Sequence, residues 1–587
     1  MSNDKHPPDG DNECLVSESL ARFLDDVQFV EEADRTEIIE ETSSSLHGGG
    51  ELATEQIDEA APQSGEEDVT EVHTGLPATG EADGTAIAGP VSVLVPVAKP
   101  QVFVGPGALQ DNINTAEALL ASTGYFFLHH GSVVVVHRDV KTGEISLRLV
   151  RKQHVLIELD GLADWMKPAR DQWVPAHPPD KVCTGLIEAR THRHLADIRG
   201  VARQPFLRPD GSLVQQAGYD RTTGIYGEFI PEDFNVPEAP TIAEARDAMV
   251  LLEGLLEEFP FRSPIDRSSA LSALLTAAVR VSLDAAPMFH VRAHQPGTGK
   301  SYLCRLTAAF ASKRTARAVT FPSSDVECGK VLLAALKDAP EVIEFDNLTA
   351  DLVPHESLCS VLTAEQYSGR ILGYSEMKTV STRSLVLSSG NNVGPVGDMT
   401  RRCIMINLDA GCELPAARKF NQPSILEDLL KDRASAVSAA LTVVRAWHVA
   451  GRSDLSTRPI ASFGQWSSNC RLPLIWLGYP DPAEAVFTAM AEDPERTLIG
   501  RLLKAMREQF GDRGAMVREI VKCAGDPASA GAADLMEVLQ EITDSTTINR
   551  RKLGHWLRRH VGHIVGDLRL ARVDVTRSST VWKAEKL

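Results

Sequence analysis

A glycine-rich run, HQPGTGKS, occupies residues 294–301. Its glycines allow successive backbone N–H groups to turn toward the oxygens of a phosphate. Lys300 is spaced to reach the β- and γ-phosphates of a nucleotide, and the hydroxyl of Ser301 is spaced to hold Mg²⁺. The run therefore predicts a site for ATP and Mg²⁺ built from six consecutive residues: Pro296, Gly297, Thr298, Gly299, Lys300 and Ser301.

The sequence on either side provides the elements that such a loop requires. An apolar run at 287–293 predicts a strand before the loop, and residues 302–311 predict a helix after it. The departure is His294, which stands where the pattern G-x-x-x-x-G-K-[ST] has its first glycine and whose side chain would narrow the loop. An ordinary glycine turn is the alternative interpretation, but the flanking strand and helix favour a phosphate loop.

A second, acidic strand is predicted at 341–347, with the sequence EVIEFDN. Asp346 ends this strand, where a carboxylate can act on the water ligands of Mg²⁺. Asn347 follows it, where a glutamate base would be expected. Because side chains alternate along a strand, Glu344 shares a face with Asp346 and is the candidate base if the strand end is shifted or bulged. The alternative is a buried strand whose carboxylates take no part in catalysis.

A third strand is predicted at 384–389, and Gly390-Asn391-Asn392 follows it. The amide of Asn391 is placed to orient an attacking water. Arg401 and Arg402 then precede another apolar strand. This position suits an arginine finger that one subunit inserts into its neighbour's site, where it would stabilise charge on the transferred phosphoryl group. A surface salt bridge is the alternative role.

The carboxy-terminal segment, 546–587, is strongly basic, with ten Lys or Arg against three acidic residues. A helix over 548–559, capped by Thr546-Thr547, is predicted to precede two strands at 569–575 and 580–586. A helix followed by a hairpin is the winged-helix pattern, in which the helix can enter the major groove and the hairpin can contact phosphates. A basic, solvated lid on an ATPase is the alternative. The candidate DNA contacts are Arg550, Arg551, Arg558, Arg559 and Arg577.

Composition divides the 587 residues into six segments. Residues 1–95 are acidic and poor in aromatic side chains, which predicts a disordered tail. Within it, apolar residues at 20, 23, 24 and 27 predict one short amphipathic helix able to dock a protein partner. The remaining segments are a β-rich domain (96–240), a helical linker (241–285), an ATPase core (286–450), a helical region (451–535) and a winged-helix-like basic domain (536–587).

The formal charge of −20 comes from the first hundred residues, which hold 23 Asp or Glu against four Lys or Arg. The acidity therefore does not argue against a nucleic-acid partner. Nine cysteines are scattered singly, without a C-x-x-C pair, which predicts a reduced protein with no zinc site. The sequence has neither a secretory leader nor an apolar run near the ~20 residues needed to cross a bilayer, so a cytoplasmic location is expected.

The order of several motifs resembles the AAA+ helicase module, close to superfamily 3, of phage, plasmid and integrative-element replication proteins. The resemblance covers residues from about 200 to 587 and implies an α/β P-loop core. It further implies a ring, with six subunits as the expected number, that translocates on single-stranded DNA and separates the duplex ahead of it. The motifs are AHQPGTGKS, VIEFDN, SGRILG (368–373), SSGNN with GDMTRR, and FGQWSSNCRLPLIWLGYPDP (463–482).

The expected function is that of an ATP-dependent DNA helicase or translocase that replicates a prophage or another mobile element, with single-stranded or forked DNA as its partner. One alternative is a nucleotide-switched DNA-binding initiator or regulator without turnover, which His294 and Asn347 favour. Another is an AAA+ remodeller of proteins, which DNA would not stimulate.

Overall fold

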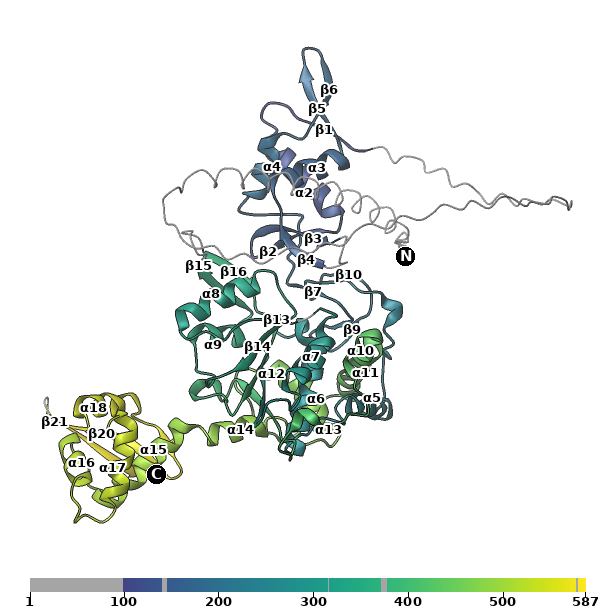
Figure 1. Ribbon diagram of the computed structural model, residues 1–587. Helices are drawn as coiled ribbons and strands as arrows, with labels where there is room; N and C mark the ends of the chain where they lie inside the picture. Colours follow the sequence, from purple (N-terminus) through teal and green to yellow (C-terminus); the bar gives the residue numbers. More distant parts are fainter. Residues whose placement is uncertain (1–98, 140–144, 315, 371–376, 577–578) are drawn as a thin grey trace, which may run out of the picture. The chain divides into compact units, whose positions relative to one another are not determined.

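The computed structural model describes residues 99–139, 145–314, 316–370, 377–576 and 579–587 (Figure 1). The predicted amphipathic helix at residues 20–27 lies outside these ranges. The described chain divides into two compact units. The smaller unit holds a three-stranded sheet in the order β1-β5-β6, formed by Gln101–Phe103, Asp164–Ala169 and Gln172–Ala176. Most of α2 (Leu109–Ser122), together with α3 (Lys152–Leu162) and most of α4 (Asp180–Ile187), belongs to the same unit.

The larger unit begins with short antiparallel strands. β2 (Phe126–His129), β3 (Ser132–Arg138) and β4 (Ile145–Leu149) form one sheet, in which Val134 pairs with Leu149. β8 (Phe206–Leu207) pairs with β9 (Leu213–Val214), and β10 (Gly218–Asp220) pairs with β11 (Ile225–Gly227). β11 also pairs, in parallel, with β7 (Gly200–Ala202). The segment that was predicted to be β-rich therefore contains several antiparallel strand pairs.

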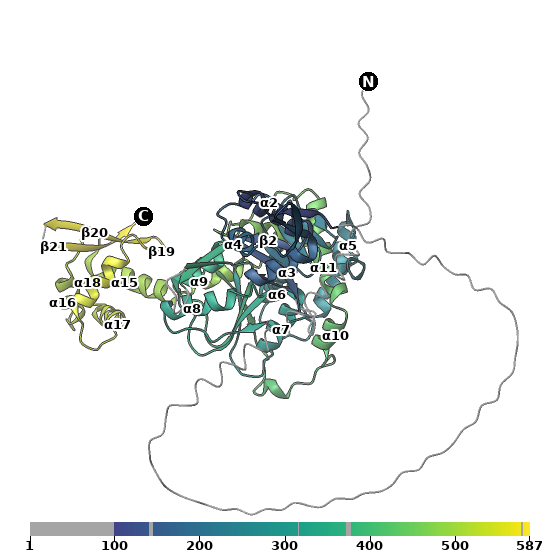
Figure 2. The same ribbon diagram turned by 90° about the horizontal axis from the view of Figure 1, so that it is seen from above.

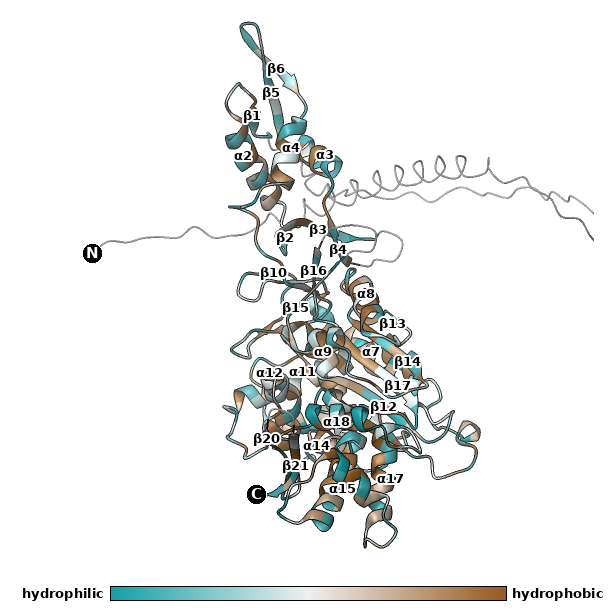
Figure 3. Cartoon of the chain, turned by 90° about the vertical axis from the view of Figure 1, so that its left-hand side faces the viewer, coloured by the Kyte–Doolittle hydropathy of each residue, from teal (hydrophilic) through white to brown (hydrophobic). Residues whose placement is uncertain are grey.

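A five-stranded, fully parallel sheet forms the centre of the larger unit. Its order is β13-β14-β17-β12-β18. The buried stretches of β12, β14, β17 and β18 are largely apolar, as expected for parallel strands covered on both faces, although His290, Glu344, Ser388 and Ser389 are buried there too; Figure 3 colours the chain by hydropathy. Their bounds are Arg317–Ala318, Val342–Leu348, Leu385–Asn391, Met288–Ala293 and Cys403–Leu408.

Helices cover the sheet. α7 (Lys300–Ala311) packs on the three central strands and α6 (Pro264–Val279) packs on β18 and α7. α5 (Ile242–Gly254) packs against α11 (Arg433–Val449), and α10 (Ile425–Lys431) lies beside α7. Two helices and a strand pair lie together beside the sheet (Figures 1 and 2). They are α8 (Asp325–Leu336), α9 (Glu356–Thr363) and the antiparallel strands β15 (Gln366–Arg370) and β16 (Met377–Ser381).

The segment predicted as a helical linker, 241–285, does contain two helices, but α6 is not an exposed linker. Nearly all its residues are buried, including hydroxyls that bond to its own backbone, such as Ser272 Oγ to Ser269 O at 2.7 Å and Thr276 Oγ1 to Ser272 O at 2.6 Å. Ala, Ser and Thr on every face allow neighbouring elements to approach α6 from all sides. The helix is therefore part of the core.

The carboxy-terminal module has its own hydrophobic cluster. This cluster runs from Ile499 to Ala584, so the module begins well before the expected boundary at residue 536. It contains α15 (Pro494–Phe510), α16 (Val517–Ala524), α17 (Ala532–Thr543), α18 (Arg550–Arg559), β19 (Ile564–Val565), β20 (Leu568–Thr576) and β21 (Ser579–Lys586). The predicted helix and hairpin are α18 and β20–β21. The cap differs from the prediction, because Asn549 Oδ1 accepts hydrogen bonds from the N–H groups of Arg551 and Lys552.

Three further helices precede this module in the chain: α12 (Gly464–Trp466), α13 (Leu472–Trp476) and α14 (Glu484–Ala491). No described helix is long and apolar enough to span a membrane.

Candidate nucleotide-binding site

The glycine-rich loop joins β12 to α7. β12 ends at Ala293 and α7 begins at Lys300, which is the strand, loop and helix context that the sequence predicted. Gly297 and Gly299 have φ values of 75° and 103°, in the region that favours glycine. At Gly297 a Cβ would also lie 2.7 Å from the Cβ of Ala416, so a larger residue would not fit. The loop backbone therefore depends on both glycines.

The Lys300 ammonium group lies against the neighbouring strand. Its Nζ donates a hydrogen bond of 2.7 Å to Asn391 Oδ1 and one of 3.4 Å to the carbonyl of Gln295. Burial lowers the pKa of Lys300 below its ordinary value. Both partners are neutral oxygens. A phosphate that reached this position would offer the ammonium group a stronger, charge-assisted partner than the amide does.

Asp346 is bonded to the P-loop serine. Ser301 Oγ donates to Asp346 Oδ1 at 2.8 Å, and Ser389 Oγ donates to the same oxygen at 2.5 Å. Burial on its own would raise the pKa of Asp346, but hydrogen bonds from Ser389, Ser301 and the N–H of Asn347 outweigh it and hold the pKa below the usual range. The carboxylate is therefore ionised at neutral pH beside the serine hydroxyl, as a Mg²⁺ site requires.

A bulge at the end of β14 produces this contact. Phe345 pairs with Ser388 and Leu348 pairs with Gly390, so Asp346 and Asn347 together lie opposite the single residue Ser389. Asn347 has a φ of 55°, which asparagine tolerates better than most residues, and its N–H donates to Ser389 Oγ at 3.1 Å. The sequence did not identify Ser389, because its role depends on a register shift that local pattern does not reveal.

Glu344 precedes this bulge in β14, and its side chain is buried, with only 6% of the residue exposed. One carboxylate oxygen, Oε1, has no hydrogen-bond partner among the described residues. Burial and the nearby charge of Asp346 raise its pKa to about 7. The hypothesis that a bulge would bring Glu344 to the reaction centre is therefore not supported, because the irregularity follows Glu344 and leaves it between the sheet and α7.

His294 forms hydrogen bonds with Asn392, the residue that follows Asn391. Its Nδ1 lies 2.7 Å from Asn392 Oδ1, and Asn392 Nδ2 donates to the carbonyl of His294 at 3.3 Å. The N–H of Asn392 also donates to the carbonyl of Ala293. The residue that departs from the phosphate-loop pattern therefore ties the loop to the end of β17.

Arg401 and Arg402 lie at the opposite edge of the sheet. Both arginines directly precede β18, whose first residue, Cys403, pairs with Met288, the first residue of β12. They therefore lie at the amino ends of these strands, whereas the glycine-rich loop follows the carboxyl end of β12. The six residues of β12 separate the two edges by roughly 20 Å, at about 3.3 Å per residue. The arginines are too far from the phosphate loop of their own chain to contact a nucleotide there.

Both arginines form ion pairs with Asp398, as the surface salt-bridge alternative expects. Their surroundings differ. The Arg401 side chain is 36% exposed, whereas that of Arg402 is 11% exposed and also donates to the carbonyl of Cys359 at 3.2 Å. Arg401 is therefore the more exposed of the two arginines.

A mainly apolar pocket of about 270 Å³ adjoins the loop glycines and was not predicted. Phe259, Tyr302 and Phe420 line it, and the rings of Phe259 and Tyr302 are 6.2 Å apart. Aromatic and apolar walls beside a phosphate loop suit a flat nucleobase. No local sequence pattern could have identified this pocket, because its three aromatic residues come from separate parts of the chain.

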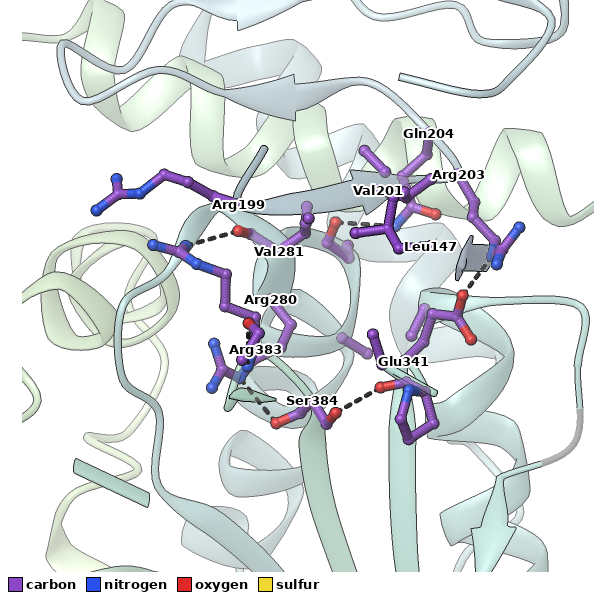
Figure 4. A pocket seen from close by; sticks show the side chains of 18 of the residues that line it. Leu147, Arg199, Val201, Arg203, Gln204, Arg280, Val281, Glu341, Arg383 and Ser384 are labelled. Carbon is purple, nitrogen blue, oxygen red and sulfur yellow. Dashed lines mark hydrogen bonds and ion pairs between the residues drawn. The ribbon is translucent and has the colours of Figure 1, made fainter. Parts of the chain in front are cut away.

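A second cavity, of about 60 Å³, contains more arginines but has a structural role (Figure 4). The guanidinium group of buried Arg280 donates to the carbonyls of Ser384, Leu283 and Thr382. Arg383 donates to Val281 O and Asp284, while Arg203 pairs with Glu341. These hydrogen bonds occupy the three arginines, which fasten α6 and the β7 region to the amino ends of β14 and β17.

The carboxy-terminal module has an open groove of about 980 Å³ beside α18. Three of the candidate DNA contacts, Arg550, Arg551 and Arg558, line it, whereas Arg559 pairs with Glu495 at 3.3 Å and does not line the groove. Arg577 lies outside the described residues. Three basic residues that the prediction omitted also line it: Arg518, Lys552 and His555.

Taken together, the fold and site define a mixed α/β protein whose five-stranded parallel sheet is consistent with a P-loop core. Within the described ranges, no group of three or more His, Cys, Asp or Glu is arranged to hold a metal ion.

No family model and no curated protein matches the chain. Solved structures that it resembles include the apo C-terminal region of NrS-1, at 9% identity and a TM-score of 0.34 over 80% of this chain and 98% of that one. Another is the Cch active helicase of SCCmec type IV, at 12% identity and a TM-score of 0.30 over 77% and 93%. The JCV helicase bound to a thiazolopyridine acetamide matches at 12% identity and a TM-score of 0.19 over 40% and 67%. Because the identities and TM-scores are low, the function proposed below rests on the site.

Proposed function

We propose that this chain is an ATP-driven DNA helicase or translocase that serves the replication of a prophage or another mobile element. The carboxyl ends of β12, β14 and β17 lie at one edge of the parallel sheet. At this edge Lys300 contacts Asn391 and Ser301 contacts Asp346, and these two contacts carry the proposal. Ligands of parallel α/β sheets bind at this carboxyl edge.

Each group at this edge would bind one part of the nucleotide or its Mg²⁺. The N–H groups of residues 297–301 would surround the phosphates, with the base in the pocket of Phe259, Tyr302 and Phe420. Lys300 would leave the Asn391 amide for the β- and γ-phosphates, which frees that amide to orient water. Ser301 and Asp346 would hold Mg²⁺, which supplies charge neutralisation on the phosphates when it is bound.

The active form would be a ring, with six subunits as the expected number, in which Arg401 acts on a neighbour's nucleotide. The roughly 20 Å between the two sheet edges favours action between subunits over action within one. Arg402, which is more buried and bonded to Cys359, would support Arg401. The basic groove beside α18 would bind DNA through Arg550, Arg551 and Arg558.

One alternative has its own support. Asn347 follows Asp346 where a base is expected, and Glu344 is buried. These residues favour a DNA-binding initiator or regulator that is switched by nucleotide without turning it over.

A strand-displacement assay separates the two functions. The full chain, with ATP and Mg²⁺, should unwind a forked DNA, whereas the Lys300→Ala variant should bind the fork without unwinding it. Nucleotide-dependent DNA binding by the native chain without ATP consumption or strand separation would instead establish the switched initiator.

A further inference from the structure

The groove beside α18 carries a positive charge that no carboxylate balances among the side chains that the structure describes. Its described lining has six basic side chains and no acidic one: Arg518, Arg550, Arg551, Lys552, His555 and Arg558. Among the described residues, no carboxylate lies within ion-pair distance of Arg518, Arg550, Arg551 or Arg558. By contrast, basic residues elsewhere in the module are paired, Arg501 with Glu537 and Glu541 and Arg569 with Glu585.

The position of these charges on α18 is unfavourable for the helix itself. Arg550, Arg551 and Lys552 occupy its first turn, where the backbone dipole favours anions over cations. Helix stability therefore does not explain them. Three cations in one turn of a helix would attract an extended anion such as a polyphosphate backbone or an acidic peptide.

The chain carries such an anion at its other end. Residues 1–98 contain 23 Asp or Glu and three Lys or Arg, whereas the other 489 residues contain 57 of each kind. At no more than 3.3–3.6 Å per residue, 98 residues can span up to roughly 320–350 Å. That contour is long enough to reach a groove anywhere on the same chain.

We propose that the acidic segment 1–98 binds the groove beside α18 and competes with DNA for it. The proposal rests on the proposed function in one respect, because it takes the groove as a DNA-binding surface. A tethered segment acts at an effective concentration that reaches the millimolar range. A segment with a Kd of about 0.1 mM would then weaken DNA binding by roughly tenfold, so that only DNA that binds tightly displaces it.

The first test neutralises the segment within the full chain. Glu→Gln and Asp→Asn changes at the 14 acidic positions between residues 31 and 71 remove most of its charge. We expect the Kd for a 20-bp duplex, measured by fluorescence anisotropy at 50 mM salt, to fall about tenfold, and this gain to vanish near 500 mM salt. A full chain with the same residues of 31–71 in shuffled order is the matched control and should bind like the native protein. An unchanged Kd in the neutralised chain at low salt would overturn the proposal.

The second test asks whether the groove is where the segment acts. A fluorescent peptide of residues 31–71 should bind the neutralised full chain, and this binding should be lost in the same chain carrying Arg551→Ala and Arg558→Ala. Arg501→Ala, which removes a paired arginine of the same module, is the control and should preserve peptide binding. Equal peptide binding by all three proteins would refute the proposal. Peptide binding that depends on the groove, in a protein whose duplex binding does not, would support the contact while disproving the groove's proposed DNA role.

Discussion

The carboxyl edge of the parallel sheet and the groove beside α18 use charge in opposite ways. At the sheet edge Lys300 and Asp346 both have hydrogen-bond partners in the same chain, since Lys300 donates to Asn391 and Asp346 accepts from Ser301 and Ser389. In the groove, Arg551 and Arg558 have no acidic partner among the described residues. In the proposed function, the sheet edge is a catalytic site, whose groups must be held in place before the nucleotide binds. The groove is a surface whose unpaired charge attracts an anionic partner.

The largest effect should follow from loss of the Asp346 charge. Asp346→Asn should preserve nucleotide binding but reduce hydrolysis by about a thousandfold or more, because Mg²⁺ would lose a charged partner. Binding of a fluorescent ATP analogue and the steady-state rate of phosphate release measure the two effects separately. Retention of both would show that the organised edge is not a catalytic site.

Loss of the finger should be nearly as severe, but it should be repairable. Arg401→Ala should leave nucleotide binding intact and lower turnover by roughly a thousandfold. Mixing it with Lys300→Ala should restore part of the activity at interfaces where an intact P-loop meets an intact Arg401. Arg402→Ala tests the distinction between the two arginines and should mainly lower thermal stability. If mixed oligomers form and remain inactive, Arg401 does not act between subunits.

Removal of the Ser389 hydroxyl should have a smaller, specific effect. Ser389→Ala deletes one hydrogen bond to a charged oxygen, worth about 1.5–3 kcal/mol, and should raise the Mg²⁺ concentration for half-maximal turnover by roughly ten- to a hundredfold. Excess Mg²⁺ should then recover most of the rate, and Ser389→Thr should resemble the native protein. A rate that stays low at all Mg²⁺ concentrations would assign Ser389 a packing role instead.

The smallest effect concerns the groove. The double change Arg551→Ala and Arg558→Ala should weaken duplex binding about tenfold at moderate salt and reduce the slope of log K against log salt by about two. Arg559→Ala removes one positive charge, from a side chain held by Glu495, and should have a much smaller effect per charge removed. Equal losses from the two proteins would mean that overall charge, and not the groove, governs binding.

Sequence reasoning succeeded where one local pattern determines one element. The glycine-rich loop, the strands that carry Asp346 and Asn391, and the helix and hairpin of the carboxy terminus all have such patterns, and all occur as elements of the structure. It failed where neighbours in space are distant in sequence. The bulge opposite Ser389, the pocket of Phe259, Tyr302 and Phe420, and the pairing of Arg559 with Glu495 each depend on how separate elements pack.

The buried position of Glu344 illustrates the same limit. Strand alternation places it on the face of Asp346, but β14 is buried up to the bulge, and the exposed residues of the strand are Asp346 and Asn347 within the bulge. Which residue activates water, if turnover occurs, therefore cannot be found from the alternation pattern alone.

Steady-state ATP hydrolysis by the full chain, with and without single-stranded DNA, tests the central claim most directly. We expect Mg²⁺-dependent hydrolysis that DNA stimulates and that Lys300→Ala abolishes, while circular dichroism shows that the variant remains folded. Hydrolysis that is unaffected by Lys300→Ala, or the absence of any hydrolysis by the native chain with DNA present, would contradict it.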